Sequence, residues 1–400
     1  MERISALALL LVPPKDERIQ LTPANSGLIL CAPWLPVALA AYLSRKRNCW
    51  ALRMSLACIA PLLIIPLAYG IEASIPNRRF VWVQGMTGCS CLVRTLELCF
   101  ASPGRLRVGE KTLPPSTSWR DALDLLLSPR GYGWDFGTGT GLVSPFKVPI
   151  DRAQFIRTTF IRAVSSYFFF DFLASLVLLA PATSAGLGST IFIEGVPPAQ
   201  RYLLSTLFTL GTGVGASLCL SMLYDLLVLF SVCVLDQPFF EWPPLFDAPW
   251  LATSLHDFWA RRWHQVFRST FLHLGGYPLE WLGLGRAGRV VGAFLASGFA
   301  HDLGIWAIDR EVHYQAMVFF TLQGLGVVAE RVFLKLTGRK VGGWPGRVWA
   351  YIVILGAAQR MIDLWHRSGV FGGTIWPSHI SFAQSFLFPS IRGYFNLGES

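Results

Sequence analysis

Charged side chains are scarce in this chain. Only 14% of its 400 residues are Asp, Glu, Lys or Arg, whereas 53% are hydrophobic; a typical soluble domain carries about 25% charged residues. Length alone would allow two or three soluble domains. The long apolar runs instead predict one polytopic membrane domain over residues 1–400, because each helical span uses about 20 apolar residues.

Motifs of several other enzyme classes are absent from the sequence. It has no Gly-x-Ser-x-Gly elbow, which argues against an α/β-hydrolase. It has no His-Glu-x-x-His motif, and Cys89-Ser-Cys91 lacks the two-residue gap of common metal and redox motifs. We therefore expect no bound metal, and we interpret the eight cysteines as buried free thiols.

Acidic residues are fewer than basic residues, 24 against 34, so that the net charge is +10. The basic residues are scattered between apolar runs, and a nucleic-acid partner is therefore not expected. Cytoplasmic loops of membrane proteins are rich in Lys and Arg, and this bias explains most of the excess. The remainder leaves room for a phosphate-bearing cosubstrate.

The hydrophobic pattern predicts an all-α protein with about eight membrane spans. Residues 101–151 are expected to form an extramembrane loop on the cytosolic side. Residues 237–250 contain several prolines and are predicted to form an irregular connection at the membrane interface, because each proline removes a backbone donor. The expected spans are 27–43, 50–69, 81–100, 158–180, 202–235, 290–308, 314–336 and 348–364, with a weaker run at 380–388.

An unusually polar and aromatic segment occupies residues 254–271. Read as one helix, it begins at Ser254 as the N-cap, and a carboxylate near its start favours the positive end of the helix dipole. Trp259 and Trp263 supply bulk on the adjoining faces. The segment is either an interfacial helix whose arginines contact lipid phosphates or the lining of a wet cavity. Helical spacing places four residues on one face: Asp257, Arg261, His264 and Arg268.

A histidine, His301, lies inside the apolar run 290–308. An ionisable group in such a segment is costly and suggests function. Small residues such as Gly298 and Gly304 make the helix slim, so that a neighbour can approach closely. The imidazole suits general-base chemistry, because its unperturbed pKa is about 6.5. The alternative is a packing histidine bonded to a carbonyl or to Asp302 of a neighbour.

Two motifs in this region resemble the membrane-bound O-acyltransferase superfamily, specifically its wax-synthase-like branch. Residues 254–264 match Ser-x-x-x-Phe-Trp-x-x-Arg-Trp-(Asn or His), and Ser297-Gly-Phe-Ala-His301 matches Ser-Gly-x-x-His. The two motif histidines are 37 residues apart, a separation that suits the family. The specific match covers residues 242–303.

The resemblance implies transfer of an acyl group from acyl-coenzyme A to a hydroxyl inside an intramembrane tunnel, with no tightly bound cofactor. It implies that His301 is the catalytic base and that His264 occupies a second motif position, often Asn in relatives. Candidate contacts to the coenzyme A phosphates are Arg261, Arg262 and Arg268. Candidate tunnel or supporting residues are Asp257, Trp259, Trp263, Ser297 and Asp302.

The stretch Arg130-Gly-Tyr-Gly-Trp134 looks like a feature of fungal members, many of which acetylate terpenoid or meroterpenoid alcohols. The resemblance therefore favours acetyl-coenzyme A and a lipophilic polycyclic alcohol as substrates, in a multi-pass protein of the endoplasmic reticulum membrane. A long-chain wax-ester synthase acting on fatty alcohols is the alternative enzyme. A transporter, with Asp171, Asp225 and His301 as a polar path, is the alternative of another class.

Overall fold

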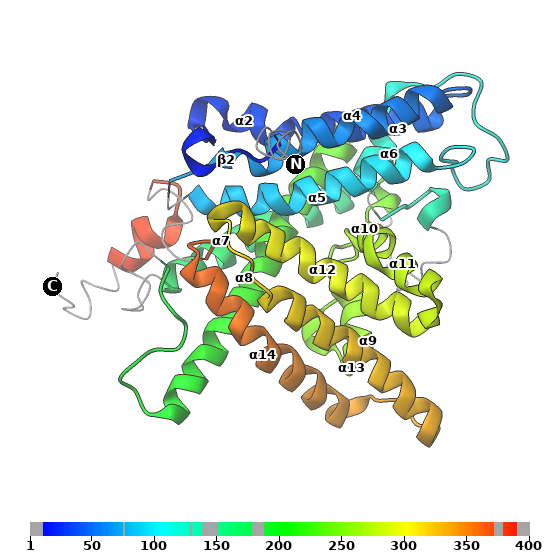
Figure 1. The fold of residues 1–400 in the computed structure, drawn as a ribbon. Coiled ribbons are helices and arrows are strands. Elements are labelled where there is room, and N and C mark those ends of the chain that lie inside the picture. Colours follow the sequence, from blue (N-terminus) through cyan, green and yellow to red (C-terminus); the bar gives the residue numbers. More distant parts are fainter. Residues whose placement is uncertain are drawn as a thin grey trace, which may run out of the picture. The chain divides into compact units, whose positions relative to one another are not determined.

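The computed structural model is almost entirely helical, as the sequence predicts (Figure 1). It describes residues 11–74, 77–128, 130–137, 151–177, 188–371 and 379–389. In these ranges the only sheet is a parallel pair of two-residue strands, β1 (Ile19–Gln20) and β2 (Ile71–Glu72). The prediction of an all-α polytopic class is therefore confirmed.

The chain divides into two compact units. The first unit comprises Met1–Ser144 and Trp250–Val353, and the second comprises Pro145–Pro249 and Ile354–Ser400. The elements of the first unit are η1 (Lys15–Glu17), α2 (Pro23–Cys31), α3 (Trp34–Arg45), α4 (Trp50–Tyr69), α5 (Arg78–Phe100), α6 (Trp119–Leu127), η3 (Asp135–Gly137), α9 (Leu255–Asp257), η6 (Phe258–Arg262), α10 (Arg268–Phe271), η7 (Leu272–Gly276), α11 (Tyr277–Leu279), η8 (Glu280–Leu284), α12 (Gly285–Asp309) and α13 (Gln315–Thr337). The second unit holds α7 (Arg152–Val177), α8 (Pro198–Cys233), η4 (Phe239–Glu241) and η9 (Ala383–Leu387), while η5 (Pro249–Leu251) and α14 (Gly343–Arg367) cross the boundary.

Six helical segments of the described chain are long and apolar enough to cross a membrane, against the expected total of about eight. Two further helices, α5 and α7, are longer than 18 residues but are not among these six. The weak run at 380–388 forms only the five-residue η9. The six segments are Pro23–Arg45, Trp50–Tyr69, Pro198–Cys233, Arg268–Asp309, Gln315–Thr337 and Gly343–Arg367.

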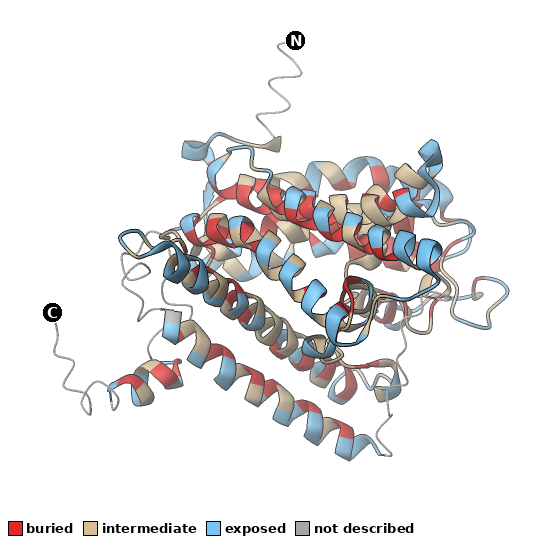
Figure 2. Cartoon of the chain, turned by 90° about the horizontal axis from the view of Figure 1, so that it is seen from below, coloured by how far each residue is buried: buried red, intermediate tan, exposed pale blue. Residues whose placement is uncertain are grey.

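Buried and exposed residues alternate along the long helices (Figure 2), and many of the exposed residues are large and apolar. In α4, for example, only 28% of the apolar window is buried, although its mean hydropathy is 2.0. Ile59, Leu62 and Leu63 of this helix are each about half exposed. Such a surface would be costly in water, and it fits contact with lipid chains.

Residues 101–128 and 130–137, within the segment expected to lie outside the membrane, contain regular structure. They contain α6 and an antiparallel bridge between Arg107 and Trp134. The Trp134 ring is fully buried, with the guanidinium groups of Arg45 and Arg107 5.1 and 4.8 Å from its centroid. Residues 138–150 of the same segment lie outside the described chain.

The helix that carries His301 is tightly packed between its neighbours. Figure 1 shows α12 running between α5 and α13. A Cβ atom at Gly298 would lie 2.4 Å from the Cα of Met317 in α13, and one at Gly304 would lie 2.7 Å from the Trp82 ring in α5. The two glycines are therefore needed for close helix approach, as the small-residue pattern predicts.

In the second unit, the carboxylates expected inside the membrane have structural partners. Asp225 of α8 accepts a hydrogen bond from Arg162 Nε of α7 at 2.6 Å. Asp171 of α7 accepts from Ser381 Oγ at 2.6 Å and from the Ala383 amide at 2.8 Å, so it anchors η9. The α8 helix is continuous over 36 residues and does not break at its glycines.

Candidate active site

The polar segment 254–271 is not one helix, which corrects the sequence-based expectation. It begins with α9 and the π-helical turn η6, but the chain turns extended at Trp263, where ψ is 151°. The side-chain amide of Gln265 donates to the carbonyls of Trp259 (2.7 Å) and Trp263 (2.9 Å). The Trp263 amide donates to the Phe258 carbonyl at 2.8 Å, closing the wide turn. The helix therefore ends here, and α10 begins at Arg268.

This break separates the four polar residues that helical spacing had placed on one face. Asp257 and Arg261 still pair at 3.5 Å, as their spacing predicts, but Arg262 Nε lies closer to Asp257 Oδ2, at 2.8 Å. His264 follows the turn, and Arg268 starts the next helix. The segment is therefore bent, and two of its arginines, Arg261 and Arg262, pair with the carboxylate of Asp257.

The start of this segment is fixed by two caps, of which the sequence analysis found one. Ser254 Oγ accepts from the Asp257 amide at 2.9 Å, so the predicted N-cap is present. The carboxylate of Glu330 in α13 accepts from the amides of Leu255 (2.7 Å) and His256 (3.0 Å). A glutamate within an apolar span was the available signal for this second cap.

An aromatic cluster connects the two motifs. The Trp259 ring centroid lies 5.9 Å from that of Phe320, and the Phe320 centroid lies 4.7 Å from the imidazole of His301. Trp263 stacks on Phe258 at 5.3 Å and lies 5.6 Å from the His264 ring. Phe320 of α13 thus contacts both Trp259 and His301, while Trp263 contacts His264.

The imidazole of His301 has a defined orientation on α12. Its Nδ1 atom lies 2.7 Å from the carbonyl oxygen of Ser297, one turn earlier. A carbonyl can only accept, so Nδ1 carries a proton, and in the neutral ring the lone pair is therefore on Nε2. This is the neutral tautomer that a general base requires.

Asp302, the neighbour of His301, has a different role. Its two carboxylate oxygens accept from the backbone amides of Ala316 (3.1 Å) and Met317 (3.0 Å). It therefore caps the first turn of α13, where a negative charge is favoured. Asp302 supports the packing of α12 against α13.

His264 lies close enough to His301 for the two side chains to interact electrostatically. Burial lowers the pKa of His264 to about 3, and electrostatic interactions with His301 and Arg130 act in the same direction. Its ring centroid lies 6.0 Å from that of Phe267. His264 is therefore neutral at physiological pH, and Arg130 of the folded segment 101–137 belongs to the same neighbourhood.

The three arginines predicted to contact phosphate differ in their surroundings. Arg262 is only 12% exposed and pairs with Asp257, and Arg261 shares that carboxylate at 47% exposure. Arg268 makes one long hydrogen bond, 3.4 Å to Gln265 Oε1. In the described part of the chain no carboxylate lies within ion-pair distance of Arg268.

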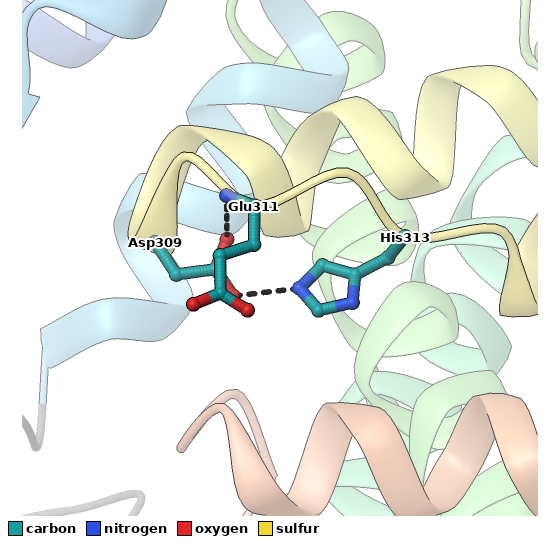
Figure 3. Close-up of side chains that lie close together, drawn as sticks. All are labelled: Asp309, Glu311 and His313. Carbon is teal, nitrogen blue, oxygen red and sulfur yellow. Dashed lines mark hydrogen bonds and ion pairs between the residues drawn. The ribbon is translucent and has the colours of Figure 1, made fainter.

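A separate polar group occurs in the connection between α12 and α13 (Figure 3). His313 Nε2 lies 2.8 Å from Asp309 Oδ2, and the amide of Glu311 donates to Asp309 Oδ1 at 2.9 Å. Figure 3 shows the Glu311 carboxylate beside this pair. The ligand atoms of the three residues lie close enough to surround a cation, but both carboxylate residues are exposed. The hydrogen bonds by themselves explain why the three side chains lie together.

Comparison with known proteins matches residues 242–322 to the model of the membrane bound O-acyl transferase family. A probable long-chain-alcohol O-fatty-acyltransferase 6 of Arabidopsis thaliana is 33% identical over 39% of this chain and 47% of its own length. The long-chain-alcohol O-fatty-acyltransferase of Simmondsia chinensis is 36% identical over 24% and 30%, respectively. The acetyltransferase aurG of Calcarisporium arbuscula is 28% identical over 32% and 34%.

These matches confirm the resemblance to the wax-synthase-like branch of that superfamily. The chain covers less than half the length of the curated relatives named here. The family model spans the polar segment, α12 with His301, and the first part of α13.

Proposed function

We propose that this protein is a membrane O-acyltransferase that transfers an acyl group from acyl-coenzyme A to the hydroxyl of a lipophilic alcohol. The observation that carries the proposal is the orientation of His301, whose Nδ1 bonds to the Ser297 carbonyl. Its Nε2 is thereby the basic atom, in a segment matched to an acyltransferase family.

In the proposed reaction, Nε2 of His301 removes the proton of the alcohol while the alcohol oxygen attacks the thioester carbonyl. The C–O bond forms, the tetrahedral intermediate collapses, and the C–S bond breaks. The imidazolium returns the proton to the departing thiolate, so that the products are an ester and coenzyme A. His264 is neutral, because burial lowers its pKa to about 3, and its N–H can donate to the oxyanion.

Arg268 is the best of the three candidate arginines for a phosphate of the acyl donor. Arg261 and Arg262 share Asp257, and an anion would compete with that carboxylate. Arg268 faces no carboxylate among the described residues, and a guanidinium suits bidentate phosphate binding. We therefore assign donor binding to Arg268 first.

For the substrates, we propose an acetyl donor and a terpenoid or meroterpenoid alcohol, in the endoplasmic reticulum membrane. The similarity to the acetyltransferase aurG supports this choice. The names of the plant relatives support long-chain alcohols and fatty acyl donors equally, so a wax-ester synthase is the second candidate. The two candidates differ in the chain length of the acyl group and in the type of alcohol that they use.

The experiment uses microsomes that contain the full chain or its His301→Ala variant. They are supplied with labelled acetyl- or palmitoyl-coenzyme A and with either a fatty alcohol or a polycyclic terpenoid alcohol. We expect ester formation by the unchanged protein and a loss of at least about 100-fold in the variant, because general bases contribute about 10²–10⁴-fold. His313→Ala, in the same unit, is the control.

Ester formation by His301→Ala at the unchanged rate would refute the proposed mechanism. Flux of an alcohol across vesicles without any ester would favour the transporter instead. The hydrogen bonds of Asp171 and Asp225 to structural partners weigh against that alternative.

A further inference from the structure

One helix, α13, contacts both motif segments at separate points along a single face. We infer that α13 fixes the separation of the two motif histidines, with Gln323 and Glu330 as the positioning residues for the segment that carries His264. The effect on catalysis rests on the proposed acyl transfer, whereas the positioning of the two segments by α13 does not. Neither side chain is placed at the reacting atoms.

The N-terminal end of α13 is attached to the helix of His301. Asp302 accepts the amides of Ala316 and Met317 at 3.1 and 3.0 Å. The backbones approach closely at Gly298, where a Cβ would lie 2.4 Å from Met317 Cα. Phe320, one turn further, places its ring 4.7 Å from the imidazole of His301.

The middle of α13 holds the first tryptophan of the polar segment. Gln323 is fully buried, and its Oε1 accepts from Trp259 Nε1 at 3.2 Å. The Nε2 group of the same amide donates to the Val353 carbonyl at 3.5 Å. The orientation of the Gln323 amide is therefore fixed by a donor on one side and an acceptor on the other. The position of the Trp259 ring relative to α13 is fixed with it.

The C-terminal half of α13 holds the beginning of the polar segment. Glu330 is 8% exposed, and its carboxylate accepts from three donors: the amides of Leu255 (2.7 Å) and His256 (3.0 Å), and Trp349 Nε1 (3.1 Å). No cation among the described residues lies within ion-pair distance of it. The three donors, two of them backbone amides, thus define the position of α9.

These contact points share one side of α13. At about 100° per residue, positions 316, 317, 320, 323 and 330 fall within an arc of about 140°. Positions 320 and 330 are about 15 Å apart along the axis at 1.5 Å per residue. A rigid helix with two attached segments therefore acts as a spacer between His301 and His264.

Two variants test the spacer by activity. Glu330→Gln places an amide nitrogen against a backbone N–H in place of an acceptor, and Gln323→Leu removes the acceptor of Trp259. We expect kcat to fall at least tenfold in each, with the KM for the acyl donor within twofold and the pH profile unchanged. Because Gln323 and Trp259 act through one bond, the double variant with Trp259→Phe should lose no more than the worse single variant.

A second measurement does not depend on activity. In a background without native cysteines, His264→Cys and His301→Cys are cross-linked with bifunctional thiol reagents of increasing length. We expect a short reagent to cross-link the pair, and we expect the yield to fall at least fivefold when Glu330→Gln or Gln323→Leu is added. If the protein shows no acyl transfer, this measurement still decides the inference.

Matched controls separate positioning from general loss of structure. Asp171→Asn removes charge from a buried carboxylate that also accepts a backbone amide and a side-chain donor. Gln84→Leu removes a buried amide that donates to the Ile29 and Leu67 carbonyls. Both controls should leave kcat and cross-linking within twofold. Unchanged kcat and cross-linking in Glu330→Gln and Gln323→Leu, or equal losses in the controls, would overturn the inference.

Discussion

The Nδ1 atom of His301 bonds to the backbone carbonyl of Ser297, at 2.7 Å. The partner is main chain, so the orientation of the imidazole depends on the helix and not on the serine hydroxyl. The Ser-Gly-x-x-His pattern thus contains one residue that acts through its backbone, one that allows close packing, and the histidine that we propose as the general base.

Replacement of Ser297 by Ala is therefore expected to leave substantial activity. The carbonyl that accepts from His301 is retained, and the lost hydroxyl is small and buried. We expect kcat/KM within about tenfold of the unchanged protein, because uncharged hydrogen bonds contribute only about 0.5–1.5 kcal/mol each. The measurement is ester formation at several donor concentrations. A loss comparable to that of His301→Ala would show that the hydroxyl itself takes part.

Replacement of Arg268 by Gln is expected to weaken acyl-donor binding selectively. A charge-assisted hydrogen bond contributes about 1.5–3 kcal/mol, so the donor KM should rise about 10- to 100-fold while the KM of the alcohol stays constant. Arg261→Gln is the matched control, since its guanidinium shares Asp257. Equal effects of the two variants, or a change confined to the alcohol, would contradict the assignment.

Local features of the candidate site could be predicted from the sequence, because they depend on neighbours along the chain. The N-cap at Ser254, the pairing of Asp257 with Arg261 and the slim helix around Gly298 are of this kind. Each follows from helical spacing or from the size of one side chain.

Other features depend on residues far apart and could not be read from spacing. The helix ends at Trp263 because Gln265 takes two carbonyls of the turn, a competition that periodicity does not encode. The buried Trp134 ring lies against the guanidinium of Arg45, which is 89 positions earlier in the chain. The role of Glu330 could be identified only from the structure, although a glutamate within an apolar span is unusual in the sequence itself.

The low pKa of His264 makes stability depend on pH. Its pKa is lowered to about 3 in the folded protein by burial, against about 6.5 when unfolded. Between these values the unfolded chain binds more protons, so the free energy of unfolding decreases as the pH falls, by up to about 1.4 kcal/mol per pH unit.

The expected result is a lower unfolding temperature at pH 4.5 than at pH 6.5 in detergent. His264→Asn, which introduces the residue often found in relatives, should reduce that difference. The pH dependence of activity between pH 6 and 9 should be the same in both proteins, because His264 stays neutral there. An identical pH dependence of unfolding in the two proteins would disprove the assignment of a low pKa to His264.

The carboxylate of Asp302 offers a test of the junction between α12 and α13. It accepts the amides of Ala316 and Met317, and removal of an N-cap side chain costs about 0.5–2 kcal/mol. Asp302→Ala should therefore lower the unfolding temperature and reduce kcat, because α13 loses its attachment beside His301. Asp302→Asn keeps one oxygen acceptor but places an amide nitrogen against the other backbone N–H, so it should recover only part of both losses. If Asp302 instead exchanged a proton with His301, Asn would be as inactive as Ala although it unfolds at a higher temperature than Ala. Comparison of the two variants by activity and thermal unfolding decides between these roles.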